Sequence, residues 1–142
     1  MSGTGKTVVN GNMTIGNGAS KVVNRTLENH STITWSANNL SGSGILNNSA
    51  DALFVAEADG SFSLSTWNNS GTILKAGGTG TTNLTGTFNN NGTVQIQSGI
   101  LKLSGNVGSG GTSTGTFVGG PGTTLELGSS VSALSQSAVI DV

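Results

Sequence analysis

The sequence contains no cysteine and no tyrosine, and it has a single proline among its 142 residues. Without cysteine, the chain can form neither a disulfide framework nor a thiolate metal site. Charged residues make up only 8% of the chain, and its formal net charge is −1. A charge so close to zero argues against electrostatic capture of nucleic acid or of an anionic membrane surface. The sequence also lacks a run of about 18 apolar residues, so we expect no direct membrane insertion.

The chain is instead rich in small and polar residues, with 24 glycines and many serine, threonine and asparagine residues. Such a composition is typical either of a disordered segment or of an all-β fold with many turns. Disorder normally accompanies high net charge and few β-branched residues. Here valine, isoleucine and threonine recur in short, evenly spaced clusters, which favours an ordered all-β fold.

A repeat of about 20 residues is the most informative feature of the sequence. Four segments share an apolar or aromatic lead residue and an asparagine two positions later. The segments begin at Leu27, Leu46, Trp67 and Phe88, so the lead residues are 19, 21 and 21 positions apart. Val107, a further 19 positions on, is the expected fifth lead residue. This period is too short for a propeller blade. Its segments also contain too few leucines for a leucine-rich repeat.

Stacked coils of this length place equivalent residues above one another, about 4.8 Å apart. One predicted core column consists of the lead residues Leu27, Leu46, Trp67 and Phe88. A second predicted core column consists of Ile33, Leu53, Ile73 and Val94. A structural ladder is predicted from Asn29, Asn48, Asn69 and Asn90, whose amides can hydrogen-bond along the stack. We therefore expect a right-handed parallel β-solenoid (β-helix) of about six to seven coils of roughly 19–21 residues.

Some segments depart from the regular repeat. Residues 49–53 fit only if one residue is inserted, because Ala50, Asp51 and Ala52 replace a Gly-Thr step. Strict alternation after Ile73 would place Lys75 inside the core, and since burying a lysine is costly we expect a bulge or turn there. Residues 1–20 are expected to form an N-terminal coil or cap, residues 108–116 an irregular Gly/Ser/Thr loop, and residues 123–127 the last recognisable strand.

The segments 88–103 and 115–127 resemble repeats of large bacterial surface proteins, namely autotransporter passenger domains and filamentous-haemagglutinin-type adhesins. The resemblance extends over residues 25–130, and its motifs are structural. It implies a right-handed β-helix that is exposed at a cell surface and used for adhesion, biofilm formation or the display of other domains. The resemblance supplies no shared catalytic residues to carry over. Because such proteins are much longer, residues 1–142 are expected to be a single solenoid segment of a longer protein.

No pattern in the sequence predicts a catalytic residue, a cofactor or a resident metal. The only histidine, His30, lies at a turn position and is expected to be solvated. The acids Asp51, Glu57 and Asp59 could gather on neighbouring turns and bind a hard cation such as calcium. The alternative that we favour is that these acids are separate, solvated turn residues.

The two tryptophans are expected to pack in the core. Trp67 is a lead residue, and Trp35 lies two positions after Ile33, where it aligns with Val55 and Ile96. An exposed tryptophan would instead suggest a platform for a sugar ring. This pattern gives no sign of such a platform.

We therefore interpret the chain as a structural or adhesive rod module of a bacterial cell-surface or secreted protein, with no enzymatic activity. Host or environmental glycans or proteins are its expected partners, and its expected location is extracellular. An alternative is a β-helix that binds or cleaves carbohydrate. A further alternative is a self-associating, filament-forming module, because end coils present open backbone edges that invite end-to-end stacking.

Overall fold

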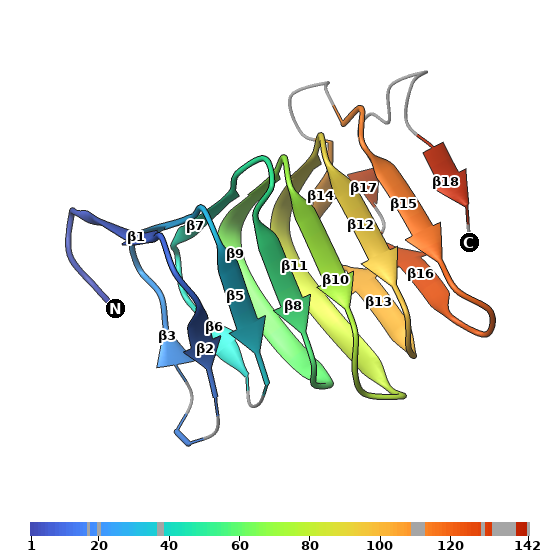
Figure 1. The fold of residues 1–142 in the computed structure, drawn as a ribbon, viewed down its shortest axis with the longest axis horizontal. Helices are drawn as coiled ribbons and strands as arrows, with labels where there is room; N and C mark the ends of the chain where they lie inside the picture. The colour runs from blue at the N-terminus through green and yellow to red at the C-terminus, as the bar shows by residue number, and fades with distance from the viewer. Residues whose placement is uncertain are drawn as a thin grey trace.

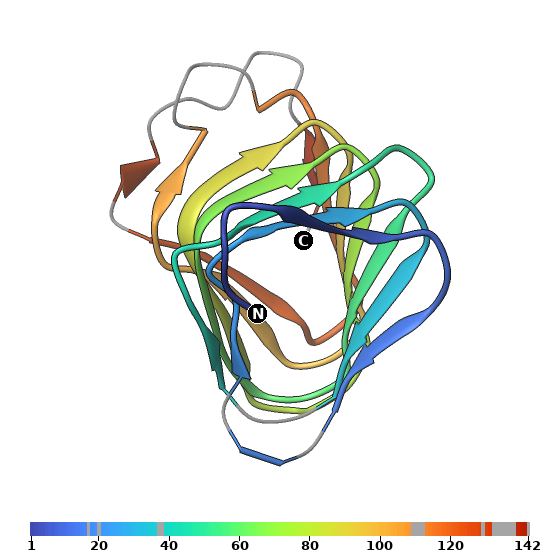
Figure 2. The same ribbon diagram turned by 90° about the vertical axis from the view of Figure 1, so that its left-hand side faces the viewer.

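The structure is a computed structural model that describes residues 1–16, 18–19, 21–36, 39–108, 113–128, 130–131 and 139–141. Throughout these residues the regular elements are β-strands, and none of the described residues forms a helix that could cross a membrane. The strands wind into about six coils that stack along one axis (Figure 1). Seen from the N-terminal end, the chain runs clockwise as it recedes (Figure 2), so the solenoid is right-handed, as predicted.

Each coil passes through three faces, and strands of successive coils pair in parallel within each face. The first face contains β1 (Lys6–Val9), β4 (Thr26–Asn29), β7 (Ile45–Asn48), the second halves of β9 (Gly60–Asn69) and β11 (Thr81–Asn90), β14 (Asn106–Val107) and β17 (Ser130–Val131). The second face contains β2 (Met13–Ile15), β5 (Thr32–Trp35), β8 (Leu53–Ala56), β10 (Thr72–Lys75), β12 (Thr93–Ile96), β15 (Thr116–Gly119) and β18 (Val139–Asp141). The third face contains β3 (Lys21–Val22), β6 (Leu40–Ser41), the first halves of β9 and β11, β13 (Ile100–Leu103) and β16 (Thr124–Leu127).

Alternation along the short strands separates the interior from the surface. In β4, β5, β7, β10, β12 and β13, every second residue is buried and the intervening residues are partly exposed. Successive side chains of a strand point to opposite sides, so a four-residue strand contributes two side chains to the core. The core is therefore built from two interior residues per strand, and the outer surface of each face remains in contact with solvent.

The long strands β9 and β11 turn the corner between the third and first faces without a loop. Their pairing shifts at a β-bulge, where the two residues Leu64 and Ser65 of β9 lie opposite the single residue Gly86 of β11. Gly86 has a φ of 125°, and a Cβ atom there would lie 2.1 Å from the carbonyl oxygen of Leu64. Only glycine tolerates both this backbone conformation and this close approach.

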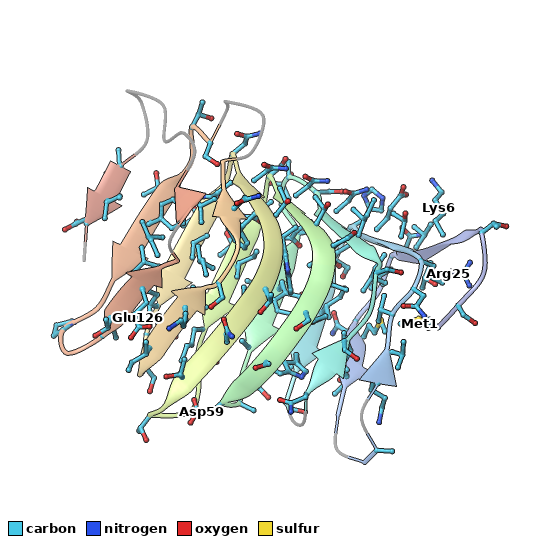
Figure 3. All side chains as sticks on the ribbon, turned by 180° about the vertical axis from the view of Figure 1, so that it is seen from behind. Met1, Lys6, Arg25, Asp59 and Glu126 are labelled. Carbon is cyan, nitrogen blue, oxygen red and sulfur yellow. The ribbon has the colours of Figure 1, made fainter. Side chains whose placement is uncertain are left out.

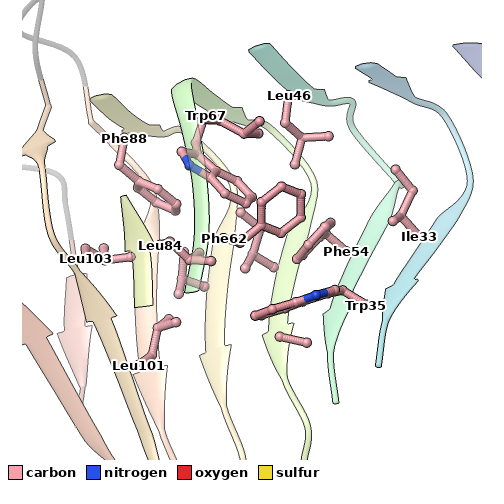
Figure 4. Close-up of a cluster of buried hydrophobic side chains, with 14 of the residues drawn as sticks. Ile33, Trp35, Leu46, Phe54, Phe62, Trp67, Leu84, Phe88, Leu101 and Leu103 are labelled. Carbon is pink, nitrogen blue, oxygen red and sulfur yellow. The ribbon is translucent and has the colours of Figure 1, made fainter. Parts of the chain in front are cut away.

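The first predicted core column is confirmed. Leu27, Leu46, Trp67 and Phe88 are in direct register, and Val107 continues the column as expected. All five side chains are at most 1% exposed. The order of Leu46, Trp67 and Phe88 along the interior can be followed in Figure 4.

The second predicted core column is correct except at Leu53. Phe54, not Leu53, is in register with Ile33 and Ile73, and it is fully buried. Leu53 instead lies in register with Thr32 and Thr72 on the outer side. The turn before β8 spans residues 49–52, whereas the equivalent turns span only two residues, 70–71 and 91–92. Two residues are therefore inserted rather than one, and Asp51 accommodates the longer turn with a left-handed φ of 65°.

The end of the chain follows the sequence-based expectation in part. Strand β16 begins at Thr124, one residue after the predicted start at 123, and pairs with β13. Of the predicted loop 108–116, residues 109–112 lie outside the described residues, and Thr116 already belongs to β15. Of residues 1–20, the predicted N-terminal coil or cap, two segments form β1 and β2 of the first coil.

Candidate functional site

The predicted asparagine ladder forms inside the corner between the first and second faces. The Nδ2 atoms of Asn29, Asn48 and Asn69 each donate a hydrogen bond of 2.8 Å to the Oδ1 atom of the next asparagine, ending at Asn90. All four side chains are at most 1% exposed. Because a buried amide without partners is costly, this continuous chain of bonds fixes the register between the coils.

The ladder asparagines also hydrogen-bond to the backbone of the next coil, at the same corner. Asn48 Nδ2 donates to the carbonyl oxygen of Thr72 at 3.0 Å, and Asn69 Nδ2 donates to that of Thr93 at 3.1 Å. Asn90 Nδ2 makes the equivalent bond to the carbonyl oxygen of Thr116 at 3.2 Å. Each of these side chains therefore satisfies backbone groups that the turn would otherwise leave unpaired.

The two ends of the ladder differ in their surroundings. Val9 is in register with Asn29 in the first coil, so an apolar side chain precedes the first amide. At the other end, the buried hydroxyl of Ser113 accepts a hydrogen bond from the backbone N–H of Asn90 at 3.1 Å. The amide ladder thus extends over four consecutive coils, from Asn29 to Asn90.

A second ladder, which sequence reasoning missed, runs along the outside of the first face. Asn89 Nδ2 donates to Asn68 Oδ1 and Asn68 Nδ2 donates to Asn47 Oδ1, both at 2.9 Å. The donors of this outer ladder point toward the N-terminus, whereas those of the inner ladder point toward the C-terminus. The sequence could have predicted this outer ladder from the paired asparagines at 47–48, 68–69 and 89–90. Alternation along a strand places one member of each pair inside and the other outside.

The aromatic side chains form the centre of the core rather than a surface platform. The rings of Trp35, Phe54, Phe62 and Trp67 form one cluster, in which Phe62 contacts the other three and Phe54 also contacts Trp67, with centroids 4.7–5.6 Å apart in tilted or edge-to-face pairs (Figure 4). All six aromatic residues of the sequence are at most 1% exposed: Trp35, Phe54, Phe62, Trp67, Phe88 and Phe117. The prediction that both tryptophans face inward is therefore confirmed.

Trp35 belongs to a column that the sequence did not predict correctly. It is in register with Ala56 rather than Val55, and Lys75 and Ile96 continue the same column. The expected bulge that would turn Lys75 outward is absent from β10, which keeps its alternation. The Lys75 side chain is consequently 0% exposed.

The buried ammonium group of Lys75 is compensated at the corner between the second and third faces. Its Nζ atom lies 3.0 Å from Asp59 Oδ1 and donates to the carbonyl oxygen of Gly77 at 2.7 Å. Asp59 Oδ2 accepts a hydrogen bond from the backbone N–H of Gly80 at 2.9 Å. Partial desolvation raises the pKa of Asp59, but the bonds from Lys75 and Gly80 outweigh it, and the net effect lowers the pKa below its ordinary value. Lys75 therefore ties two successive coils together.

This arrangement engages both oxygens of Asp59, one with Lys75 and the other with the backbone N–H of Gly80. Within the described ranges, no three histidine or acidic residues lie close enough together to hold a metal ion. His30 is exposed at its turn, as predicted, with Nε2 3.9 Å from Glu28 Oε2. The calcium hypothesis thus gains no geometric support from the described residues.

Two open hollows lie on the corner between the third and first faces. The larger, about 660 Å³, is lined in part by Lys102, Gly105 and Glu126, and the Lys102 and Glu126 side chains form an ion pair of 3.0 Å. The smaller, about 360 Å³, is lined in part by Gly5 and Arg25 and contains no carboxylate. Glycoside hydrolysis requires two carboxyl groups about 5–9.5 Å apart. Neither hollow provides such a pair.

Neither a protein family nor a curated protein nor a solved structure matches this chain in sequence or fold comparison. The fold and its internal hydrogen bonds define the class of protein. The chain is a β-solenoid with an internal asparagine ladder.

Proposed function

We propose that this chain is a structural rod segment of a bacterial cell-surface or secreted protein, which holds other parts of that protein, or an adhesive surface, away from their anchor. The observation that carries the proposal is the unbroken stack of the interior. One apolar column and one amide ladder pass through consecutive coils without a gap. Such a stack resists bending and shear, because every coil is bonded to both of its neighbours.

The outer surface supports the same function. Few charges and many hydroxyl and amide groups cover it, including the outer ladder of Asn47, Asn68 and Asn89. This composition gives solubility without attracting polyanions, which suits an extracellular rod. The resemblance of residues 88–103 and 115–127 to surface-protein repeats adds an argument from sequence for this location.

Carbohydrate recognition is a weaker candidate. Sugar-binding β-structures commonly present an aromatic ring to the sugar face, and here every aromatic side chain is buried. We therefore expect no product from pectin, alginate or other polysaccharides, and no saturable binding on a glycan array. Release of reducing ends, or saturable binding to a defined glycan, would replace the rod proposal with the carbohydrate one.

A direct test of the rod function uses tandem copies of the chain placed between a surface anchor and a fluorescent reporter. For a rigid rod, the height of the reporter rises linearly with the number of copies, by roughly 30 Å for each. A Gly/Ser-rich linker of equal length is the matched control, because its reach grows only with the square root of its length. Square-root growth for the solenoid copies would contradict the proposal.

A further inference from the structure

The outer side of the second face is a regular array of side chains. From β2 to β15 its strands pair residue for residue with no shift in register, and they lie side by side in Figure 1. Every second residue of each strand faces outward, so these residues form two files along the stack. The threonine file consists of Thr32, Leu53, Thr72, Thr93 and Thr116, and the aliphatic file consists of Thr14, Thr34, Val55, Leu74, Gln95 and Val118.

Neither file contains a charged residue. The nearest acids along the chain, Asp51 and Glu57, lie in the turns that flank β8. Lys6, Arg25 and Glu126 belong to the first and third faces and their shared corner, which Figure 3 views from behind. Because a charged group is costly to strip of its hydration shell, its absence lets the second face contact a surface that offers no counter-charge.

The hydroxyl groups of the threonine file are available to solvent. Its four threonines are partly exposed, and their hydroxyls make no hydrogen bond to any other residue that the structure describes. The polar groups of the first face differ, because the amides of Asn47, Asn68 and Asn89 bond to one another in the outer ladder. Water is therefore the partner of the threonine hydroxyls in solution.

Methyl groups lie next to these hydroxyls. Val55, Leu74 and Val118 occupy the aliphatic file, and each threonine adds a methyl group of its own. Apolar groups do not bond to water, and they restrict the orientations of the water molecules that cover them. The second face thus combines groups that anchor water molecules with groups that order them.

The spacing of the threonine file suits an ordered layer of water. Paired strands lie about 4.8 Å apart, so Thr72, Thr93 and Thr116 repeat at about this distance along the stack. This repeat differs by only a few tenths of an ångström from that of water molecules along the a axis of hexagonal ice. Three consecutive hydroxyls can therefore stand close to the positions of lattice oxygens before the mismatch accumulates.

A protein or a glycan fits this face less well. At the spacings of a parallel sheet, the face from β5 to β15 covers roughly 300 Å², well below the ~800 Å² that each partner buries in a stable protein interface. Sugar rings favour stacking on aromatic side chains, and all six aromatic residues are buried. A growing ice crystal needs no aromatic platform, and its surface repeats like the two files.

We propose that the second face binds the surface of ice, with the hydroxyls of Thr72, Thr93 and Thr116 taking the places of lattice water oxygens. Ice that carries bound protein grows only between the bound molecules, where its surface becomes curved and its local freezing point falls. Ice binding and the rod function are independent, because a rod needs no ligand on this face. The spacer experiment therefore tests the rod function whether or not ice is bound.

The test measures thermal hysteresis, which is the gap between the melting point of an ice crystal and the temperature at which it begins to grow. Wild-type protein should open a measurable gap and produce faceted crystals. Thr72→Lys, in the middle of the threonine file, should reduce the gap at least about tenfold at equal concentration, because binding would strip water from the ammonium group. Thr93→Lys should repeat this loss one coil further along. Both lysines can extend into solvent in the free protein, so circular dichroism and the melting temperature should remain those of the wild type.

Thr66→Lys is the matched control, because Thr66 is an outward threonine of the same coil as Thr72 but lies on the first face. It should retain the hysteresis of the wild type. Two test positions are used so that a folding defect at one leaves the other decisive. A wild-type protein that neither opens a gap nor shapes ice overturns the proposal, as does full activity in the folded Thr72→Lys or Thr93→Lys variant. An equal loss in Thr66→Lys would also overturn it, by showing that the second face is not the ice-binding surface.

Discussion

Two interior columns of side chains run next to each other along the second face, and they differ in the kind of residue that they contain. The apolar column, Ile33, Phe54, Ile73 and Val94, lies next to the asparagine ladder and contains only hydrophobic side chains. The lysine column, Trp35, Ala56, Lys75 and Ile96, lies next to the opposite corner and includes a charged residue.

The position of each column relative to its corner explains the difference. A lysine in the apolar column would have no carboxylate within reach, because amides occupy the neighbouring corner. Lys75 reaches Asp59, whose side chain is 41% exposed and so retains part of its hydration. A buried charge is tolerated where its partner needs little desolvation, because desolvation is the main cost of a buried ion pair. Alternation can therefore hold in a solenoid even where it buries a lysine.

The largest expected effect concerns the apolar column. Phe54→Ala removes the ring that contacts both Phe62 and Trp67, with centroids 5.5 and 5.6 Å away. We expect it to lower the free energy of unfolding by about 3–5 kcal/mol. Leu53→Ala is the matched control, and because Leu53 lies on the outer side it should cost far less. Urea denaturation measures both, and an equal or larger loss for Leu53→Ala would show that the register of β8 is wrong.

The second prediction concerns the lysine column and removes the carboxylate that pairs with Lys75. Asp59→Asn leaves the ammonium group of the fully buried Lys75 without a counter-ion. We expect a clear loss of stability, smaller than that of Phe54→Ala because water reaches Asp59. The double variant Asp59→Asn with Lys75→Met should recover most of the loss. Failure of the second substitution to rescue the first would mean that the ion pair is not the cause.

Acid should weaken the same ion pair. The pKa of Asp59 in the folded protein lies below its ordinary value of 3.8, chiefly because of its bonds to Lys75 and Gly80. Its stabilising contribution is therefore fully present above about pH 4 and is lost as the pH falls through the lowered pKa. Urea denaturation at a series of pH values should show a steeper acid loss for the wild type than for Lys75→Met. Parallel profiles would contradict this account.

Replacing the lysine itself should have the smallest effect. Lys75→Met keeps a long, flexible side chain in the column but removes the charge, and Asp59 can then be solvated. Replacing a buried ion-pair member by an apolar residue of similar volume is often neutral or stabilising. We therefore expect a change within about 1 kcal/mol of zero, or a gain. A strong destabilisation would instead mean that the bonds of the Lys75 ammonium group to Asp59 and to the carbonyl oxygen of Gly77 are essential.

The sequence predicted the features that repeat and missed those that depend on a single coil. The ladder and the lead column could be recognised because asparagine, and an apolar or aromatic residue two positions before it, recur every 19–21 positions. Leu53 was misplaced because the length of one turn decides which of two adjacent apolar residues, Leu53 or Phe54, faces inward. Turn lengths vary with local backbone conformation, here the left-handed Asp51, and they leave little trace in a hydrophobic pattern.

The inward position of Lys75 was missed for a related reason. Its partner Asp59 is 16 residues earlier in the sequence, on the turn of the preceding coil. Sequence analysis considered Asp59 only as one member of an acid cluster, because the alignment of the two corners was unknown. The outer ladder could have been predicted from the sequence, since each Asn-Asn pair places one amide on either side of the strand.

The most direct test of the account is nuclear Overhauser contact between residues one coil apart in isotopically labelled protein. The stack predicts contacts from the Trp67 ring to the methyl groups of Leu46 on one side and to the Phe88 ring on the other. It also predicts that the Trp67 indole N–H exchanges slowly with solvent, since it is buried and donates to the carbonyl oxygen of Thr85. A rapidly exchanging indole N–H, with no contact to either neighbour, would contradict the stacked solenoid.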